Sequence, residues 1–596
     1  MHMLLTKYCI LVLILSISIS VTGQQLAENI RLNQIGFYPD APKIAVVVDF
    51  ESESDFYLAR PEEDEQLFSG KMGAQRQVKF SDRTTRIADF SSFTKPGTYV
   101  IVIPELGHSY PFEIKENAHR EISKASIKGF YFQRMSTELP DQYAGKWSRP
   151  AGHPDEKIIV HPSAASPERP AGTIISAPKG WYDAGDYNKY VVNSGITMGT
   201  LLSAYEDFPE YFQDLDLNIP ESNNQVPDIL DEVLWNLRWM LNMQDPHDGG
   251  VYHKLTTPGF EGLTVKPHEA KKDRYVVQKG TAAALNFAAV TAQASRIYTK
   301  YNNEFPGLAD SCIEASKKAW DWALKNPDFL YMQNEMNQQY EPDITTGAYG
   351  DQDVSDEFIW AASELFATTG DGSYLESVEL FPDQNAPVPS WSQVRTLGYF
   401  TLAKFNSDFN KVSSQDAETV KKLILSLADS LISGVNDRAY QTVMGGTEQD
   451  FIWGSSAVAA NQGIVLIQAY KITSNKEYLD YALTNLDYLL GRNATGYSFV
   501  TGHGSKTAQN PHHRLSVSSV VEEPVPGLLI GGPNANAPRQ DKCPGYTSTA
   551  ADEVYIDDDC SYASNEIAIN WNAPLAYLAS ALEALQHQAA FSTKGN

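Results

Sequence analysis

The sequence predicts a mainly α-helical protein with a small all-β domain in front of it. Short β-rich segments separated by turn residues fill residues 29–116, a spacing typical of a β-sandwich. After about Ala118 the apolar residues recur at helical spacing instead. The chain is also longer than one hydrophobic core usually holds. We therefore expect a leader at 1–23, a β-sandwich at 24–117 and a helical domain at 118–596.

The first residues are typical of a secretory signal. Lys7 precedes an apolar run, and small residues at 21–23 lead to a plausible cleavage point before Gln24. The run is too short and too rich in serine to span a membrane, and no cysteine follows it to carry a lipid anchor. We expect a secreted or periplasmic protein without a membrane span.

Five strands are expected in the β domain. Turn residues such as Lys95-Pro96-Gly97 separate them. The strands are expected at 44–48, 56–58, 86–90, 98–102 and 110–114.

The helical domain has several strongly periodic segments joined by long connections that contain glycine and proline. Helices are expected at 229–241, 281–298, 355–368, 457–473, 478–490 and 565–585. Periodicity alone does not fix their number. No low-complexity linker separates the domains, so they should pack directly together, and the long loops leave room for a site.

Composition excludes some partners. With 47 basic and 74 acidic residues, the chain is poorly suited to nucleic acid or anionic membranes. An aromatic content of 11% suits a neutral polysaccharide as well as a large core. We expect a monomer.

Cys543 and Cys560 could pair in an oxidising compartment or stay free, and Cys312 should pack as a small apolar residue.

The loop at 180–187 is the most informative motif. It places Asp183 and Asp186 three residues apart between bulky aromatics such as Trp181. Gly185 should let this loop turn sharply, and the rings could stack on sugars. An acidic turn that merely faces water remains the alternative.

Two distant segments add further polar groups. Glu566 opens an expected helix with apolar next turns, which would raise the pKa of its carboxyl as a general acid requires. It could instead only complement a helix N-terminus. His512 and Arg514 could hold sugar hydroxyls or form a solvated basic loop, and no carboxylate or cysteine at a suitable spacing favours zinc there.

Paired acids with aromatic surfaces favour glycoside hydrolysis over acyl or phosphoryl transfer. Neither a Gly-x-Ser-x-Gly elbow nor a phosphate-binding glycine loop is evident in the sequence.

At this point the motifs resemble those of glycoside hydrolase family 9, in the subgroup with an N-terminal immunoglobulin-like domain. The resemblance covers nearly the whole chain after the leader. It rests on the segments 30–37, 181–186, 226–232, 239–241, 498–514 and 555–573. It implies an (α/α)6 barrel and an inverting β-glucanase.

The resemblance also implies roles for individual residues. Asp186 would be the general base, Asp183 would orient the water, and Glu566 would be the general acid. Asp557 would support the surroundings of the acid. Residues that would contact substrate are His512, Arg514, Asp557, Trp181 and Tyr562.

Metals are implied as structural ions, since the chemistry needs no cofactor. Zinc is doubtful because the segment that ends at His153 has no cysteine nearby. Calcium could be held by Asp353, Asp356 and Glu357, although the last two could equally be first-turn helix acids.

We therefore expect an endo-acting enzyme on β-1,4-glucosidic bonds of cellulose or related β-glucans. A preference for xyloglucan or mixed-linkage glucan, or exo action, remains open. A glycan-binding protein without catalysis would not need Asp183, Asp186 and Glu566 together. An adhesion module would leave the helical domain unexplained.

Overall fold

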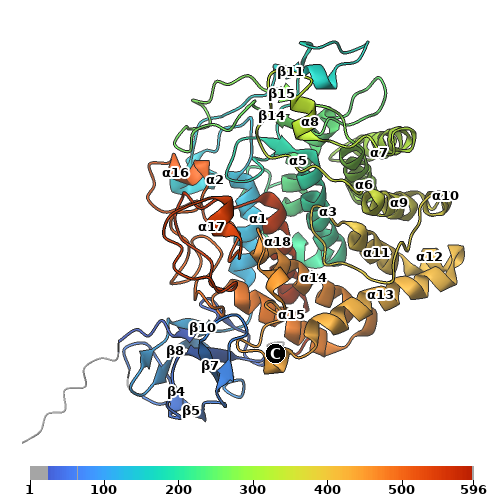
Figure 1. Ribbon diagram of the computed structural model, residues 1–596. Helices are drawn as coiled ribbons and strands as arrows, with labels where there is room; N and C mark the ends of the chain where they lie inside the picture. The colour runs from blue at the N-terminus through green and yellow to red at the C-terminus, as the bar shows by residue number, and fades with distance from the viewer. Residues whose placement is uncertain (1–24, 64, 594–596) are drawn as a thin grey trace, which may run out of the picture.

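The computed structural model describes residues 25–63 and 65–593, so the expected leader lies outside the described residues. A β domain and a larger helical domain follow one another along the chain (Figure 1). Within these residues, none of the helices combines the length and the apolar character that a bilayer crossing requires.

The first domain is the predicted β-sandwich. One sheet has the strand order β1-β3-β7-β6, and the other has β2-β10-β8-β4-β5 with β9 beside β8. Its core contains Phe37, Phe56, Ile101 and Phe112. Each expected strand overlaps an observed one. The bounds are β1 Ile30–Arg31, β2 Gly36–Phe37, β3 Ile44–Val48, β4 Asp55–Ala59, β5 Phe68–Lys71, β6 Arg76–Gln77, β7 Thr84–Asp89, β8 Gly97–Ile103, β9 Gly107–His108 and β10 Phe112–Ile114.

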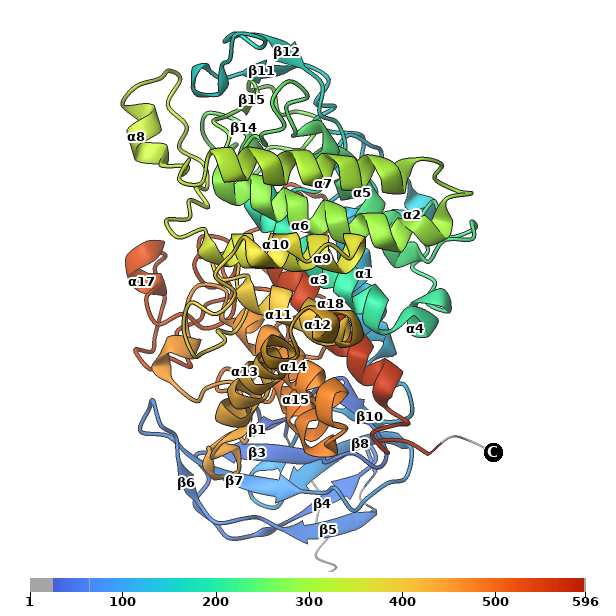
Figure 2. The same cartoon turned by 90° about the vertical axis from the view of Figure 1, so that its right-hand side faces the viewer.

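The sheet that contains β3 packs on the helical domain. Successive strand residues point to opposite faces, and both faces of β3 are buried. Val47 faces the sandwich core, whereas Val46 and Val48 form a cluster with Tyr440 of the helical domain. Figure 2 shows these strands beneath the helices α13 Ser414–Ile432, α14 Ser455–Thr473 and α15 Lys476–Leu489. The expected direct contact between the domains is confirmed.

The second domain is an (α/α)6 barrel. In its inner layer α3 packs on α6, α6 on α9, α9 on α11, α14 on α18 and α18 on α3, while α13 contacts both α11 and α14. The inner helices are α3 Val191–Asp207, α6 Thr281–Tyr298, α9 Ser355–Thr369, α11 Arg395–Lys404, α14 Ser455–Thr473 and α18 Ile569–Leu585. Outer helices include α1 Arg120–Phe132, α5 Asp228–Asn242, α7 Leu308–Lys325, α13 Ser414–Ile432 and α15 Lys476–Leu489.

Side-chain pattern separates the two layers. Every residue of α6 except Arg296 is buried, as expected for a helix that is apolar or small on all sides. In α7, by contrast, one stripe that includes Cys312, Ala319 and Trp322 is buried and the other face is solvated. Inner helices therefore have neighbours all round, and outer helices cover them.

The loops at one end of the barrel carry short elements that periodicity did not predict. A small sheet there has the order β12-β11-β15-β14-β13 and lies at the top of Figure 1. Its strands are β11 Ile158–Val160, β12 Ile174–Ile175, β13 Lys189–Tyr190, β14 Lys254–Thr256 and β15 Tyr275–Val276. Short helices also occur in connections at both ends of the barrel: α2 Asp141–Ala144, α4 Pro209–Gln213, α8 Gln333–Asn337, α10 Ser373–Glu376, α12 Asn406–Val412, α16 Arg514–Val517 and α17 Ala537–Gln540.

One predicted helix start is wrong. The expected helix at 565–585 begins at Ile569, so Glu566 precedes α18 in an extended segment. Glu566 is therefore not a first-turn acid of α18, so the alternative that it only complements the N-terminus of that helix does not hold.

Candidate active site

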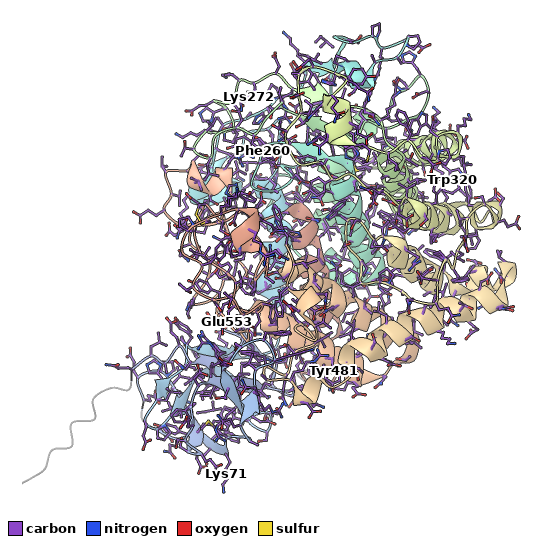
Figure 3. The ribbon with its side chains drawn as sticks, viewed as in Figure 1. Lys71, Phe260, Lys272, Trp320, Tyr481 and Glu553 are labelled. Atoms are coloured by element: carbon purple, nitrogen blue, oxygen red, sulfur yellow. A yellow bond between two sulfur atoms is a disulfide. The ribbon has the colours of Figure 1, made fainter. Side chains whose placement is uncertain are left out.

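Three segments far apart in the sequence meet at the mouth of the barrel. Short backbone bridges join Ala184 to Ala568 and His512 to Glu566. The amide of Arg514 donates to the carbonyl of Gly185 at 3.1 Å. Together these segments line a cleft of about 890 Å³. Phe260, labelled in Figure 3, also lines it.

Both carboxylate oxygens of Asp183 are held by protein donors. Asn193 Nδ2 donates to Oδ1 at 2.6 Å, and the Tyr349 hydroxyl donates to Oδ2 at 2.9 Å. Burial, and then the neighbouring Asp186, raise the pKa of Asp183 well above its usual range. The two aspartates therefore favour a single negative charge between them.

Asp186 keeps one oxygen free. Asn188 Nδ2 and the Tyr190 hydroxyl donate to Oδ2 at 2.7 and 2.8 Å, whereas Oδ1 is buried without a protein partner. Asp186 also lines the cleft. A buried polar atom without a partner costs stability, so its retention points to a ligand or water at that position.

Gly185 brings Glu566 beside the two aspartates. Its backbone amide donates to Glu566 Oε1 at 3.2 Å. The expected sharp turn at Gly185 is not the reason for glycine here, because its φ is not positive. A Cβ at this position would instead lie 2.0 Å from the carbonyl oxygen of His512. Close approach of two backbones requires the glycine.

Glu566 has the electrostatic character of a general acid. Burial raises the pKa of its carboxyl well above the usual range, and the charge of Asp186 adds to that effect. Arg514 and the amide of Gly185 act in the opposite direction. A carboxyl group that stays protonated near neutral pH can give a proton to a leaving oxygen.

His512 and Arg514 also line the cleft. His512 Nδ1 donates to the carbonyl of Asp559 at 2.6 Å, and burial lowers the pKa of the ring. The neutral imidazole thus presents Nε2 as an acceptor. The Arg514 guanidinium donates to the carbonyls of Gly185 and Glu261, and it has low exposure. Both side chains are oriented by backbone groups rather than by solvent.

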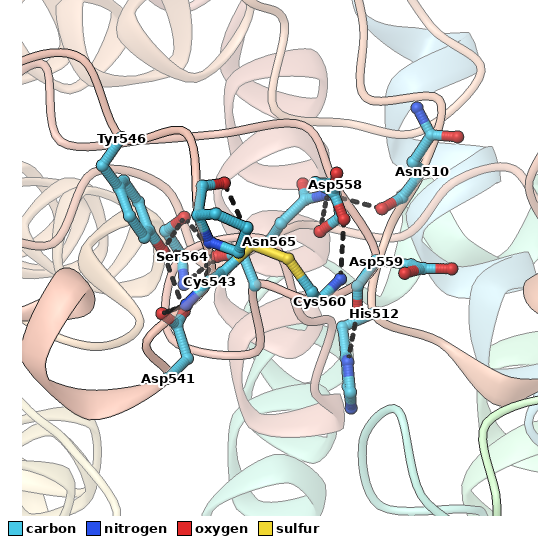
Figure 4. The surroundings of a disulfide bond; sticks show 12 residues. Asn510, His512, Asp541, Cys543, Tyr546, Asp558, Asp559, Cys560, Ser564 and Asn565 are labelled. Atoms are coloured by element: carbon cyan, nitrogen blue, oxygen red, sulfur yellow. Dashed lines mark hydrogen bonds between the residues drawn. A yellow bond between two sulfur atoms is a disulfide. The ribbon is translucent and has the colours of Figure 1, made fainter.

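A disulfide joins Cys543 to Cys560, next to the residue that orients His512 (Figure 4). The sequence left open whether these cysteines are paired or free, and in the structure they are paired. Asp557, expected to contact substrate, accepts from the amides of Gln509 and Asn510, each at 2.8 Å. Its contacts organise the loop that leads to His512.

Trp181 is the clear correction among the expected substrate contacts. It is 1% exposed, and its indole donates to Glu232 Oε1 at 2.8 Å. It therefore belongs to the core, because its ring has no open face. Tyr562 does line the cleft, as expected. Further aromatic side chains of the cleft are Phe260, Trp391, Trp453 and Trp571.

The residues near His153 do not fit a zinc ion. His153 Nδ1 is hydrogen-bonded to the Tyr182 hydroxyl at 2.9 Å, and burial lowers the pKa of the ring to about 2. Among the described cysteines, Cys543 and Cys560 are bonded to each other and Cys312 is buried in α7. That leaves no thiolate to complete a structural zinc site.

Several buried carboxylate oxygens lie at the start of α9. Asp351 Oδ2, Asp356 Oδ1 and both carboxylate oxygens of Glu357 are buried without hydrogen-bond partners. Carboxylate oxygens are the ligands that calcium prefers. Asp353 is corrected: its side chain is exposed and accepts from the Ser355 amide at 3.0 Å. Asp351, rather than Asp353, has a buried oxygen without a protein partner in this segment.

Sequence reasoning missed the side chains that hold the two aspartates. Asn188, Tyr190 and Asn193 follow the loop closely, but Asx and aromatic residues after an acidic turn are too common to signal a site. Tyr349 is more than 160 residues away in sequence. Only the fold brings its hydroxyl to Asp183.

Comparison with known proteins agrees with this arrangement. The family model for glycosyl hydrolase family 9 matches residues 119–579, and that for the cellulase N-terminal ig-like domain matches residues 25–108. A xyloglucan-specific endo-beta-1,4-glucanase of Bacteroides ovatus is 48% identical over 94% of both chains. Endoglucanase D of Acetivibrio thermocellus is 33% identical over 94% of this chain and 85% of its own.

A solved structure extends the likeness to the fold. The Bacteroides ovatus family 9 structure superposes with a TM-score of 0.89 at 46% identity, covering 94% of this chain and 100% of the other. The barrel and the β-sandwich in front of it are thus shared with a family 9 structure. The chain belongs to glycoside hydrolase family 9.

Proposed function

We propose that this glycoside hydrolase is an inverting endo-β-1,4-glucanase in which Asp186 is the general base and Glu566 the general acid. The single observation that carries the proposal is the free Oδ1 of Asp186, buried in the cleft near a carboxyl group with a raised pKa. Two carboxyl groups with different protonation states suit acid–base cleavage of a glycosidic bond.

In the proposed reaction Asp186 Oδ1 takes a proton from a water molecule as that water attacks the anomeric carbon. Asp183, fixed by Asn193 and Tyr349, orients the same water. Glu566 protonates the leaving oxygen as the glycosidic bond breaks. Attack opposite the leaving group inverts the anomeric configuration and requires the base and acid roughly 6.5–9.5 Å apart.

We propose a substituted β-1,4-glucan such as xyloglucan as the preferred substrate. Phe260, Ile452 and Trp453 line the cleft and are 45%, 46% and 40% exposed. Apolar faces at an open rim can contact sugar side branches as well as the backbone. The xyloglucan specificity of the Bacteroides ovatus relative supports this choice over cellulose.

Product analysis tests both parts of the proposal. The purified protein is incubated with xyloglucan, carboxymethylcellulose, mixed-linkage glucan and chitosan, and the products are followed by size and by NMR. We expect rapid loss of chain length on xyloglucan and α-configured reducing ends in the first-formed products. A β-configured first product would overturn the inverting mechanism, and only terminal release would overturn endo action. Binding of glycan without any hydrolysis would favour a non-catalytic protein.

We also propose that the mature enzyme works outside the cytoplasm, as a monomer. The leader-like pattern at 1–23 and the Cys543–Cys560 disulfide support an oxidising compartment. Mass spectrometry of the protein recovered outside the cytoplasm should identify Gln24 as its N-terminal residue. An intact Met1 on the cytoplasmic protein would contradict this location.

A further inference from the structure

A buried lysine lies behind the proposed base. Lys254 in β14 is paired directly with Tyr190 in β13, and the Tyr190 hydroxyl donates to Asp186 Oδ2 at 2.8 Å. Lys254 is 0% exposed, and its Nζ is 5.5 Å from the centre of the Tyr190 ring. One aromatic side chain therefore separates a buried amine from the base.

The hydrogen bonds of Lys254 fit an ammonium group. Nζ lies 2.6 Å from Gln333 Oε1, 2.7 Å from the Gly347 carbonyl and 3.1 Å from Thr346 Oγ1. Gln333 Nε2 donates to the Thr346 carbonyl, which fixes Oε1 as the atom that faces Nζ. A carbonyl and an amide oxygen can only accept.

The third partner also accepts. The Thr256 hydroxyl donates to the Thr257 carbonyl at 2.9 Å, so Thr346 Oγ1, 2.6 Å away, donates to Thr256 and accepts from Lys254. Three acceptors match the three donors of an ammonium, whereas a neutral amine has two. These three partners suit an ammonium group and are themselves uncharged.

Asp186 is the anion whose field acts on this cation. Burial lowers the pKa of Lys254 well below its usual range, and the charge of Asp186 opposes this effect. Among the described residues, the acceptors of its Nζ are an amide oxygen, a hydroxyl and a carbonyl, and none is a carboxylate. By the symmetry of a Coulomb interaction, the ammonium stabilises the charged form of Asp186 to the same extent.

We propose that Lys254 is a positioning residue that keeps Asp186 ionised while Glu566 remains protonated, acting through Tyr190 and through its own positive charge. The inference rests on the proposed role of Asp186 as the base. Asp186 shares the cleft with two other carboxyl groups, so further negative charge near it is unfavourable. A cation on the opposite side offsets that repulsion without occupying space needed by the sugar.

Other titratable groups face this pair from the surrounding elements. Asp183 and Glu566, both with a raised pKa, are the carboxyl groups that face Asp186, and His512 faces it as a neutral ring with a lowered pKa. On the far side, Lys254 faces the rings of Tyr190 and Tyr331. His253, next in the chain, has its pKa lowered to about 3 by burial and stays neutral. Lys254 is the buried cation of this set.

The test is the pH dependence of kcat/KM, which reports the groups of the free enzyme. Lys254→Met removes the charge, and Gln333→Glu neutralises it in place by setting a carboxylate against Nζ. Both variants should move the acidic limb of the profile to higher pH by about 1 unit. At pH values above the shifted limb, their activity should approach that of the wild type. Lys254→Arg and Gln333→Met keep a positive charge and should leave the limb near its wild-type position.

Each result bears on the proposal. A uniform loss of activity at every pH in Lys254→Met would show a structural role only, and an unmoved acidic limb in active Gln333→Glu would overturn the inference. Should Lys254→Met fail to fold, as seen by circular dichroism, Gln333→Glu decides alone. Failure of the proposed function would look different, because the wild-type protein would then hydrolyse no glucan and would have no pH profile.

Discussion

The two aspartates of the 183–186 loop differ in how their oxygens are held. Asp183 has a donor on each oxygen, and Asp186 has two donors on one oxygen and none on the other. Hydrogen bonds to a carboxylate stabilise its charged form and fix its orientation. The two acids can therefore have different roles, with Asp183 orienting a water molecule and Asp186 accepting its proton.

Replacement of these acids should therefore have unequal effects. Asp186→Asn and Glu566→Gln should each lower kcat by about 10³-fold or more, since each removes a proton-transfer group. Asp183→Asn should lower it less, by about 10- to 100-fold. Initial rates on soluble glucan measure this, with oligosaccharide binding by calorimetry and thermal unfolding as controls for the fold. Near wild-type activity in Glu566→Gln would remove that residue from the acid role.

The basic limb of the pH profile should belong to Glu566. Catalysis needs its protonated form, so activity falls as pH rises through its raised pKa. Arg514 lowers that pKa by its charge, so Arg514→Met should raise the pKa of Glu566 further and move the basic limb to higher pH. The same variant should bind substrate more weakly and so have a higher KM. Arg514→Lys keeps the charge and should keep the limb. A basic limb that moves down in Arg514→Met would contradict this assignment.

At the scale of elements, the sequence predicted only part of the barrel. α6 was predicted to the residue, because many buried positions repeat at one spacing, and α9 and α14 to within two residues at each end, whereas α3, α7 and α13 were not predicted. β13 and β14, of two and three residues, are too short to show a period, yet they carry Tyr190 and Lys254. Gly185 was recognised as special for the wrong reason, since only the fold reveals the approach of His512. Local pattern thus found the acids but not the contacts that set their charge.

The start of α9 leads to a prediction about calcium, which we propose binds Asp351, Asp356 and Glu357. Their unpaired buried oxygens repel one another without a cation, so chelation should lower the thermal midpoint and added calcium should restore it. Asp351→Asn should weaken this response. The matched control is Asp353→Asn, which keeps an exposed capping side chain and should respond as the wild type does. Calorimetry with metal analysis measures it, and an unchanged midpoint in protein shown to lose calcium would contradict the site.

At the scale of the whole molecule, the β-sandwich and the barrel share buried groups. Asn33 Nδ2 donates to Asp487 Oδ1 at 2.8 Å, and the Tyr38 hydroxyl donates to Glu583 Oε1 at 2.6 Å. Arg83 forms an ion pair with Glu553, which lies beside the sandwich in Figure 3. These contacts are distant from the cleft, so the sandwich stabilises the barrel without touching the proposed chemistry.

The two domains should consequently unfold together. Val46 and Val48 of β3 are buried against Ile87 and Tyr440, so separating the domains would expose this apolar cluster to water. We expect one calorimetric transition for the full chain. Val48→Asp buries an unpaired charge at the interface and should split that transition or lower it by several degrees. Thr98→Lys, on an exposed position of β8, should leave it unchanged. Two separate transitions in the wild type would show that the domains fold independently, whatever the contacts between them.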